Sequence, residues 1–171
     1  ASAISDDAVD KIYTIKGREA TKALPVFVNN FEMAKSLIEL NDKAKILAKK
    51  FWPGKLTIVG KYIGKGISKK IINEENTLGV RIPNCEHILS IIDALGHPIT
   101  GTSANLSGKP NCMTYDDLEK QFGKTLSNIP ILGISTPQAC NKASTIVKCV
   151  GDDIKVLRLG AISKSDIESA Y

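Results

Sequence analysis

The sequence has 171 residues, of which 43% are hydrophobic and 24% are charged, and this composition excludes a disordered chain. No apolar run approaches the roughly 20 residues needed to cross a bilayer, and the N-terminal residues lack the apolar centre of a secretory signal. The length suits one domain over residues 1–171, and the net charge of +5 favours a polyanionic partner. We therefore expect a cytoplasmic protein without a membrane partner.

The first third of the chain predicts helices around one short strand. Ser5 is a suitable N-cap for a helix that ends near Lys16 and Gly17. Residues 24–28 (LPVFV) read as a strand because they are rich in β-branched and aromatic side chains. Residues 31–51 have helical periodicity with an interruption, which predicts two helices, the second capped by Asp42.

The middle of the chain alternates strands and helices. Strands are predicted over 55–63, 77–83 and 98–102, and a helix over 85–95. We expect Asn84 to cap this helix and Gly96 to end it.

The segment that follows begins with the loop GTSANLSG at 101–108. A capping box with Thr114 and Asp117 then predicts another helix. Further strands are predicted over 129–133, 144–150 and 154–160, with a short helix from Ser163. Strands thus alternate with helices and then cluster, which predicts the α/β class with one mixed sheet.

Several familiar catalytic patterns are missing from the sequence. It contains no G-x-x-x-x-G-K-[ST] phosphate loop, no G-x-G-x-x-G after a strand and no G-x-S-x-G elbow. The four cysteines form no C-x-x-C pair and there are only two histidines, so we expect reduced thiols and no metal ligands in the protein. Nucleophilic catalysis by a serine is not favoured either.

What remains is a set of basic and small polar residues near predicted turns. Of the 23 basic residues, 20 are lysines, and the three arginines are Arg18, Arg81 and Arg158. Arginine binds phosphate or carboxylate groups through two parallel hydrogen bonds, and lysine cannot form this bidentate contact. Positively charged and hydroxyl groups without a nucleophile suit nucleotide binding and phosphorus chemistry, which depends mainly on positioning and charge.

These segments together resemble the YrdC family of threonylcarbamoyl-AMP synthases. Six motifs match in the family order along the chain, and they contain all three arginines. They are K-x-R at 16–18, W-P-G-x-L-T at 52–57, V-R-x-P at 80–83, S-x-N at 103–105, S-T-[IV]-V at 144–147 and L-R-x-G at 157–160.

The resemblance implies a twisted mixed sheet flanked by helices, with a basic concave face. It also implies an enzyme that joins L-threonine, bicarbonate and ATP to give threonylcarbamoyl-AMP and pyrophosphate, with Mg²⁺ held by the nucleotide. The product would serve threonylcarbamoyladenosine modification of tRNA by separate transferase proteins.

The resemblance also assigns roles to individual residues. Lys16 and Arg18 would neutralise substrate charge, and Ser103 and Asn105 would bind the nucleotide. Thr102 would add a hydroxyl group beside them. The remaining residues that it implies for the pocket are Trp52, Thr57, Arg81, Ser144 and Arg158.

The family's usual first strand and its P-T-[DE]-T-x-Y-G-L segment, which contributes to the threonine site, have no match in this sequence. Two explanations stay open: the sequence is a fragment, or that wall of the pocket is missing. An alternative function is a catalytically weak module that binds tRNA or double-stranded RNA through its lysines. A third is a carbamoyl-AMP-forming relative of the kind found inside hydrogenase-maturation proteins.

Overall fold

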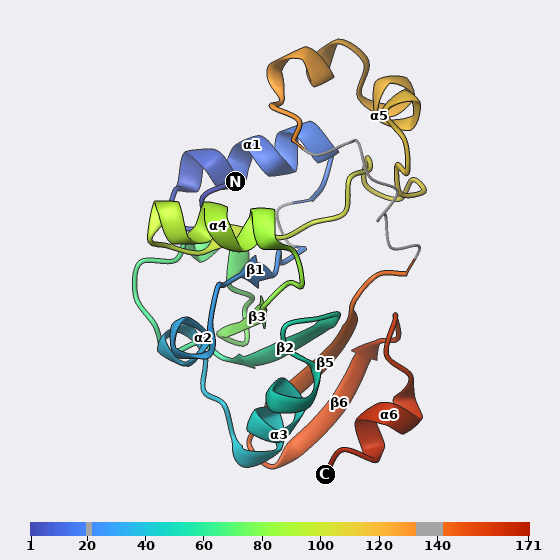
Figure 1. Ribbon diagram of the computed structural model, residues 1–171. Helices are drawn as coiled ribbons and strands as arrows, with labels where there is room; N and C mark the ends of the chain where they lie inside the picture. The colour runs from blue at the N-terminus through green and yellow to red at the C-terminus, as the bar shows by residue number, and fades with distance from the viewer. Residues whose placement is uncertain (20–21, 133–141) are drawn as a thin grey trace.

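The computed structural model describes residues 1–19, 22–132 and 142–171, and a mixed sheet runs through this part of the chain (Figure 1). Its six strands lie in the order β4-β1-β3-β2-β5-β6. Their bounds are Val26–Phe27 (β1), Leu56–Lys61 (β2), Thr77–Arg81 (β3), Ile99–Thr100 (β4), Thr145–Val150 (β5) and Asp153–Arg158 (β6). The α/β fold with a mixed sheet is therefore confirmed.

Parallel and antiparallel pairs alternate across this sheet. Strand β1 is parallel to β3, and β2 is parallel to β5. The pairs β1–β4, β2–β3 and β5–β6 are antiparallel. The register places Thr57 of β2 beside Ile146 of β5 and Phe27 of β1 beside Arg81 of β3. Residues from distant parts of the sequence thus meet on adjacent strands.

Helices and short 3-10 turns surround the sheet. They are α1 (Asp6–Lys16), α2 (Phe31–Leu37), α3 (Asp42–Phe51), η1 (Lys69–Ile71), α4 (Glu86–Leu95), α5 (Tyr115–Phe122), η2 (Gly123–Asn128) and α6 (Lys164–Glu168). Figure 1 shows α1, α4 and α5 toward one end of the molecule and α3, β6 and α6 toward the other. None of the helices in the described ranges is long and apolar enough to cross a membrane.

Local capping explains where most of these helices begin. The Ser5 side chain accepts a hydrogen bond from the Ala8 amide at 3.2 Å, and α1 ends at Gly17, whose φ of 55° is left-handed. The predicted capping box is present at α5, where the side chains of Thr114 and Asp117 each bond to the other's backbone amide. These three predictions are confirmed because capping depends on neighbouring residues only.

Two predicted caps were wrong by one residue. Asn41, and not Asp42, caps α3: its side chain accepts from the Ala44 amide at 2.7 Å. The N-cap of α4 is Cys85 rather than Asn84, and the Cys85 side chain makes no capping hydrogen bond. Adjacent polar residues compete for a cap, and the path of the preceding chain decides between them.

The predicted strand over 129–133 was also wrong across its described part. Residues 129–132 follow η2 without forming a strand, and residue 133 lies outside the described ranges. Pro130 has no amide hydrogen for a strand ladder, and Leu132 is 71% exposed. The apolar run therefore does not reflect burial. The other predicted strands are present, although shorter than predicted.

The hydrophobic core lies against the sheet and joins α1, α2 and α3 to it. Fully buried side chains include those of Val9 in α1, Leu47 in α3 and Ile58 in β2. Ile167 of α6 belongs to the same core. The core therefore fixes α1 and the central strands in place, and both carry residues of the predicted site.

Candidate active site

The loop at 102–112 is built around the buried ammonium group of Lys16. This side chain is only 5% exposed and comes from the last turn of α1. Its Nζ donates hydrogen bonds to the carbonyl oxygens of Ser103 and Asn105, each at 2.6 Å, and lies 3.4 Å from Asn105 Oδ1. We call Lys16, Ser103 and Asn105 the loop cluster.

Asn105 organises the loop from within. Its Oδ1 accepts a hydrogen bond from Ser103 Oγ at 2.5 Å, and its Nδ2 donates to the carbonyl oxygens of Leu106 at 2.9 Å and Lys109 at 2.6 Å. Asn105 is 8% exposed, whereas Ser103 and Thr102 are exposed. The loop therefore presents its hydroxyl groups on a backbone that buried side chains hold in shape.

A second set of predicted residues meets where β2, β5 and β6 lie side by side. Thr57 Oγ1 lies 3.0 Å from Ser144 Oγ. The Arg158 guanidinium donates to the Ser144 carbonyl oxygen at 2.8 Å and to Ser144 Oγ at 3.2 Å. We call Thr57, Ser144 and Arg158 the strand cluster. Arg158 is exposed, so its guanidinium remains accessible to a ligand.

Arg18 adds a further positively charged group to the predicted site. Its guanidinium donates to the carbonyl oxygens of Lys22 at 3.2 Å and Ala23 at 3.0 Å. Burial lowers the pKa of Lys16, and the positive charge of Arg18 lowers it further. Partial burial and the same charge also lower the pKa of Arg158. The charge of Arg18 thus lowers the pKa of one basic residue in each cluster, and three positive charges favour an anionic ligand.

Arg81 lies beside the turn that contains Trp52. Its Nε donates to the Gly54 carbonyl oxygen at 2.6 Å, and its guanidinium carbon is 5.4 Å from the centre of the Phe27 ring. The Trp52 indole donates to the Leu56 carbonyl oxygen at 2.7 Å, and the peptide bond after Trp52 is cis. These contacts anchor Arg81 and Trp52 to the start of β2, next to Thr57.

Two neighbours of the strand cluster were missed by the sequence analysis. The buried Thr145 hydroxyl donates to the Ile162 carbonyl oxygen at 2.6 Å and accepts from the Gly160 amide at 2.9 Å. A side chain at Gly160 would place Cβ 2.3 Å from the Ala143 carbonyl oxygen. Gly160 is therefore required for the close approach of the segment after β6 to Ala143 and Ser144. Thr145 belongs to the S-T-[IV]-V motif and Gly160 to the L-R-x-G motif, so these two motifs could have indicated both residues from the sequence.

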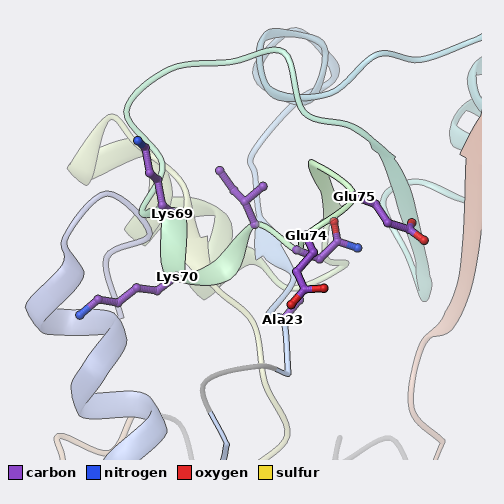
Figure 2. Close-up of a pocket in the computed structure, with 7 residues that line it drawn as sticks. Ala23, Lys69, Lys70, Glu74 and Glu75 are labelled. Atoms are coloured by element: carbon purple, nitrogen blue, oxygen red, sulfur yellow. The ribbon is translucent and has the colours of Figure 1, made fainter.

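A separate polar cavity of about 500 Å³ is lined by residues that belong to neither cluster (Figure 2). Its charged residues are partly neutralised, since Lys70 pairs with Asp10 and Glu75 pairs with Lys148. Figure 2 shows the ends of Lys70 and Glu75 pointing away from one another. None of the ten predicted site residues lines this cavity, although the carbonyl oxygen of Ala23 at its edge accepts from Arg18. The cavity is therefore distinct from the candidate active site.

The donor set of the site suits phosphate groups better than a metal ion. The two clusters consist of lysine, arginine, hydroxyl and amide groups. Positively charged side chains do not coordinate Mg²⁺, which prefers carboxylate, carbonyl and water oxygens. No group of three or more potential metal ligands among His, Cys, Asp and Glu occurs in the described part of the chain. Three cysteines of that part, Cys85, Cys112 and Cys149, have free thiols. The described residues of the two clusters therefore offer no carboxylate that could hold a resident Mg²⁺ ion.

Comparison with known families assigns the chain to one of them. The family model Sua5/YciO/YrdC, described as "Telomere recombination", matches residues 1–160. The chain belongs to the Sua5/YciO/YrdC family.

Two relatives in this family carry the same functional name. A threonylcarbamoyl-AMP synthase of Bacillus subtilis strain 168 is 33% identical over 170 residues, which are 99% of this chain and 48% of the relative. A putative threonylcarbamoyl-AMP synthase of Methanocaldococcus jannaschii is 35% identical over 164 residues, which are 95% of this chain and 74% of the relative. The chain thus spans about half the length of the Bacillus subtilis relative.

Solved structures of the family have the same fold. The structure of P. abyssi Sua5 complexed with L-threonine matches with a TM-score of 0.89 at 30% identity, covering 99% of this chain and 49% of that one. E. coli YciO matches with a TM-score of 0.78, and its 17% identity supports the fold only. The mixed sheet described above is therefore the family's sheet.

Proposed function

We propose that the chain forms threonylcarbamoyl-AMP from L-threonine, bicarbonate and ATP. The observation that carries this proposal is the folding of the predicted residues into two hydrogen-bonded clusters of basic and hydroxyl groups, the loop cluster and the strand cluster. Five of the six motifs, spread over most of the sequence, supply these residues. The names of the relatives, and the threonine bound to P. abyssi Sua5, support the same reaction and substrate.

The reaction balances without a protein nucleophile. The threonine amine takes up bicarbonate to give a carbamate and water. A carbamate oxygen then forms a bond to the α-phosphorus of ATP, and the bond from that phosphorus to the bridging oxygen of the β-phosphate breaks. Pyrophosphate leaves with the electron pair. The protein's contribution is to hold both substrates in line and to stabilise negative charge at phosphorus.

Each cluster has a part in this reaction. Ser103 and Thr102 are exposed hydroxyl groups that bind the nucleotide, while Asn105 shapes the loop beneath them. Arg158 and Ser144 bind phosphate oxygens, and Arg18 neutralises charge between the two clusters. Lys16 contributes by holding the loop in shape, because its ammonium group already donates hydrogen bonds to the carbonyl oxygens of Ser103 and Asn105.

The remaining residues shape the same site. Arg81 and Trp52 form the wall next to Thr57. Mg²⁺, when it accompanies ATP, would neutralise phosphate charge from the nucleotide side. The product would then serve threonylcarbamoyladenosine modification of tRNA by transferase proteins in the cytoplasm, and the whole chain from 1 to 171 would act as one domain.

The test is pyrophosphate release from ATP, with the adenylate identified by mass spectrometry. Release is expected to require both threonine and bicarbonate. Arg18→Ala should lower the rate about 100-fold, the size expected when one charge-stabilising donor is lost. Lys35→Ala, an exposed lysine of α2, is the matched control and should leave the rate unchanged. Release that ignores threonine, or that survives Arg18→Ala, would contradict the proposal.

A further inference from the structure

The side chain of Gln121 binds the backbone of the loop at 102–112 at other positions than Lys16 does. Gln121 lies near the end of α5 and is half-buried. Its Oε1 accepts a hydrogen bond from the Leu106 amide at 3.0 Å, and its Nε2 donates to the Pro110 carbonyl oxygen at 2.8 Å. Both ends of one side-chain amide thus bind loop backbone, four residues apart.

The helix that carries Gln121 is itself fixed to the end of this loop. Asp117 Oδ2 accepts from the backbone amides of Met113 at 2.9 Å and Thr114 at 3.0 Å. Asp117 and Gln121 are one helical turn apart, so both project from the same face of α5. These bonds fix α5 relative to the end of the loop, and so they also fix the position of Gln121.

Both backbone polar groups of Leu106 are held by side-chain hydrogen bonds. Its carbonyl oxygen accepts from Asn105 Nδ2 at 2.9 Å, and its amide donates to Gln121. The next amide, that of Ser107, donates to the Lys16 carbonyl oxygen at 2.8 Å. The loop is therefore anchored to α1 through Lys16 and to α5 through Gln121, with Asn105 between them.

From this geometry we propose that Gln121 is a positioning residue of the nucleotide site. It holds the loop in the shape that presents Ser103, without touching the substrate itself. The inference rests on the proposed function, because it assigns that loop to ATP. A loop that leaves its binding shape lowers the affinity for ATP by the fraction of time it is displaced, whereas chemistry in the bound state is preserved.

The test uses three variants of the whole chain. Gln121→Met keeps the length of the side chain and removes both hydrogen bonds. Gln121→Glu keeps the acceptor for the Leu106 amide and loses the donor to Pro110. Lys120→Met, on the neighbouring position of α5, is the control. We expect Gln121→Met to raise the KM for ATP about tenfold with kcat within about twofold, Gln121→Glu to have an intermediate effect, and Lys120→Met to have none.

A purely structural role would give a different pattern. Loss of folded protein lowers kcat, because fewer molecules are active, and leaves the KM for ATP unchanged. That pattern in Gln121→Met and Gln121→Glu would overturn the proposal. An unchanged KM for ATP together with full activity in both variants would overturn it as well.

Direct measurements separate this inference from the proposed activity. Calorimetric binding of ATP should weaken about tenfold in Gln121→Met, and hydrogen–deuterium exchange at the Leu106 amide should speed up. If the unaltered chain forms no adenylate but these two changes occur, the proposed function fails and the positioning role stands. If binding and exchange match those of Lys120→Met, the positioning role fails whatever the activity.

Discussion

The loop cluster and the strand cluster are held together in different ways. Thr57 and Arg158 lie in paired strands and Ser144 directly precedes one, so the hydrogen bonds between strands hold these residues in place independently of their side chains. The segment 102–112 contains no strand or helix, and it depends on Lys16, Asn105 and Gln121 to bond its backbone. Single substitutions should therefore disturb the loop cluster more than the strand cluster.

The largest effect is expected from Lys16→Met. This change leaves the carbonyl oxygens of Ser103 and Asn105 without their ammonium donor. An unpaired buried polar group costs about 1–3 kcal/mol, and removal of a buried charge returns part of that, so we expect the free energy of unfolding to fall by about 2 kcal/mol. Pyrophosphate release at ATP concentrations below the KM should fall about 100-fold, because the loop is then displaced from its binding shape most of the time.

Urea denaturation and the release assay measure these two effects. Lys11→Met, an exposed lysine of the same helix, is the control and should change neither. If Lys16→Met unfolds at the same urea concentration as Lys11→Met, the loop does not depend on the buried ammonium and the contrast between the clusters is lost.

A smaller effect is expected from Thr57→Val. Thr57 is only 1% exposed, and valine matches its shape but lacks the hydroxyl that contacts Ser144 Oγ. The strands remain paired and Arg158 still donates to Ser144, so about 1 kcal/mol of stability and about tenfold in activity should be lost.

A double-mutant cycle of Thr57→Val with Ser144→Ala measures this contact directly. A coupling free energy of about 1 kcal/mol is expected for two hydroxyl groups in contact. Additive effects of the two changes would show that the side chains act independently. A loss as large as that of Lys16→Met would mean that the strand cluster is no more robust than the loop cluster.

The sequence was informative wherever neighbouring residues decide the structure. The caps at Ser5 and Thr114 and the stop at Gly17 depend on contacts within a few positions, and each was predictable. The choice of Cys85 over Asn84 depends on how the chain leaves β3, which local patterns do not contain. Likewise, the apolar run at 129–132 resembled a strand although Leu132 is exposed.

The candidate active site, too, could be predicted from the sequence only in part. The motifs gave the residue types, but not their partners, because the oxygens bound by Lys16 lie 87 and 89 residues further along the chain. Gln121 belongs to no motif, and only the folded loop shows its two contacts. Residues that bind substrate are therefore easier to find from sequence than residues that hold them in place.

The smallest effect concerns the titration of Lys16. Burial is the main cause that lowers the pKa of Lys16, and the charge of Arg18 is the second. The ionised thiol of Cys112 acts in the opposite direction. Arg18→Met removes the like charge, so the pKa of Lys16 should rise yet remain below 10.5, because the burial is unchanged. Carbon-13 NMR of the Lys16 side chain, with Lys11→Met as the control, measures the shift.

The same shift affects stability with a definite sign. Because folding disfavours the charged form of Lys16, the folded state binds fewer protons than the unfolded state between the lowered pKa and 10.5. In that window the contribution of Lys16 to stability rises with pH, and it should rise less in Arg18→Met. A Lys16 titration that is identical in both proteins would place Arg18 too far away to connect the loop cluster with the strand cluster.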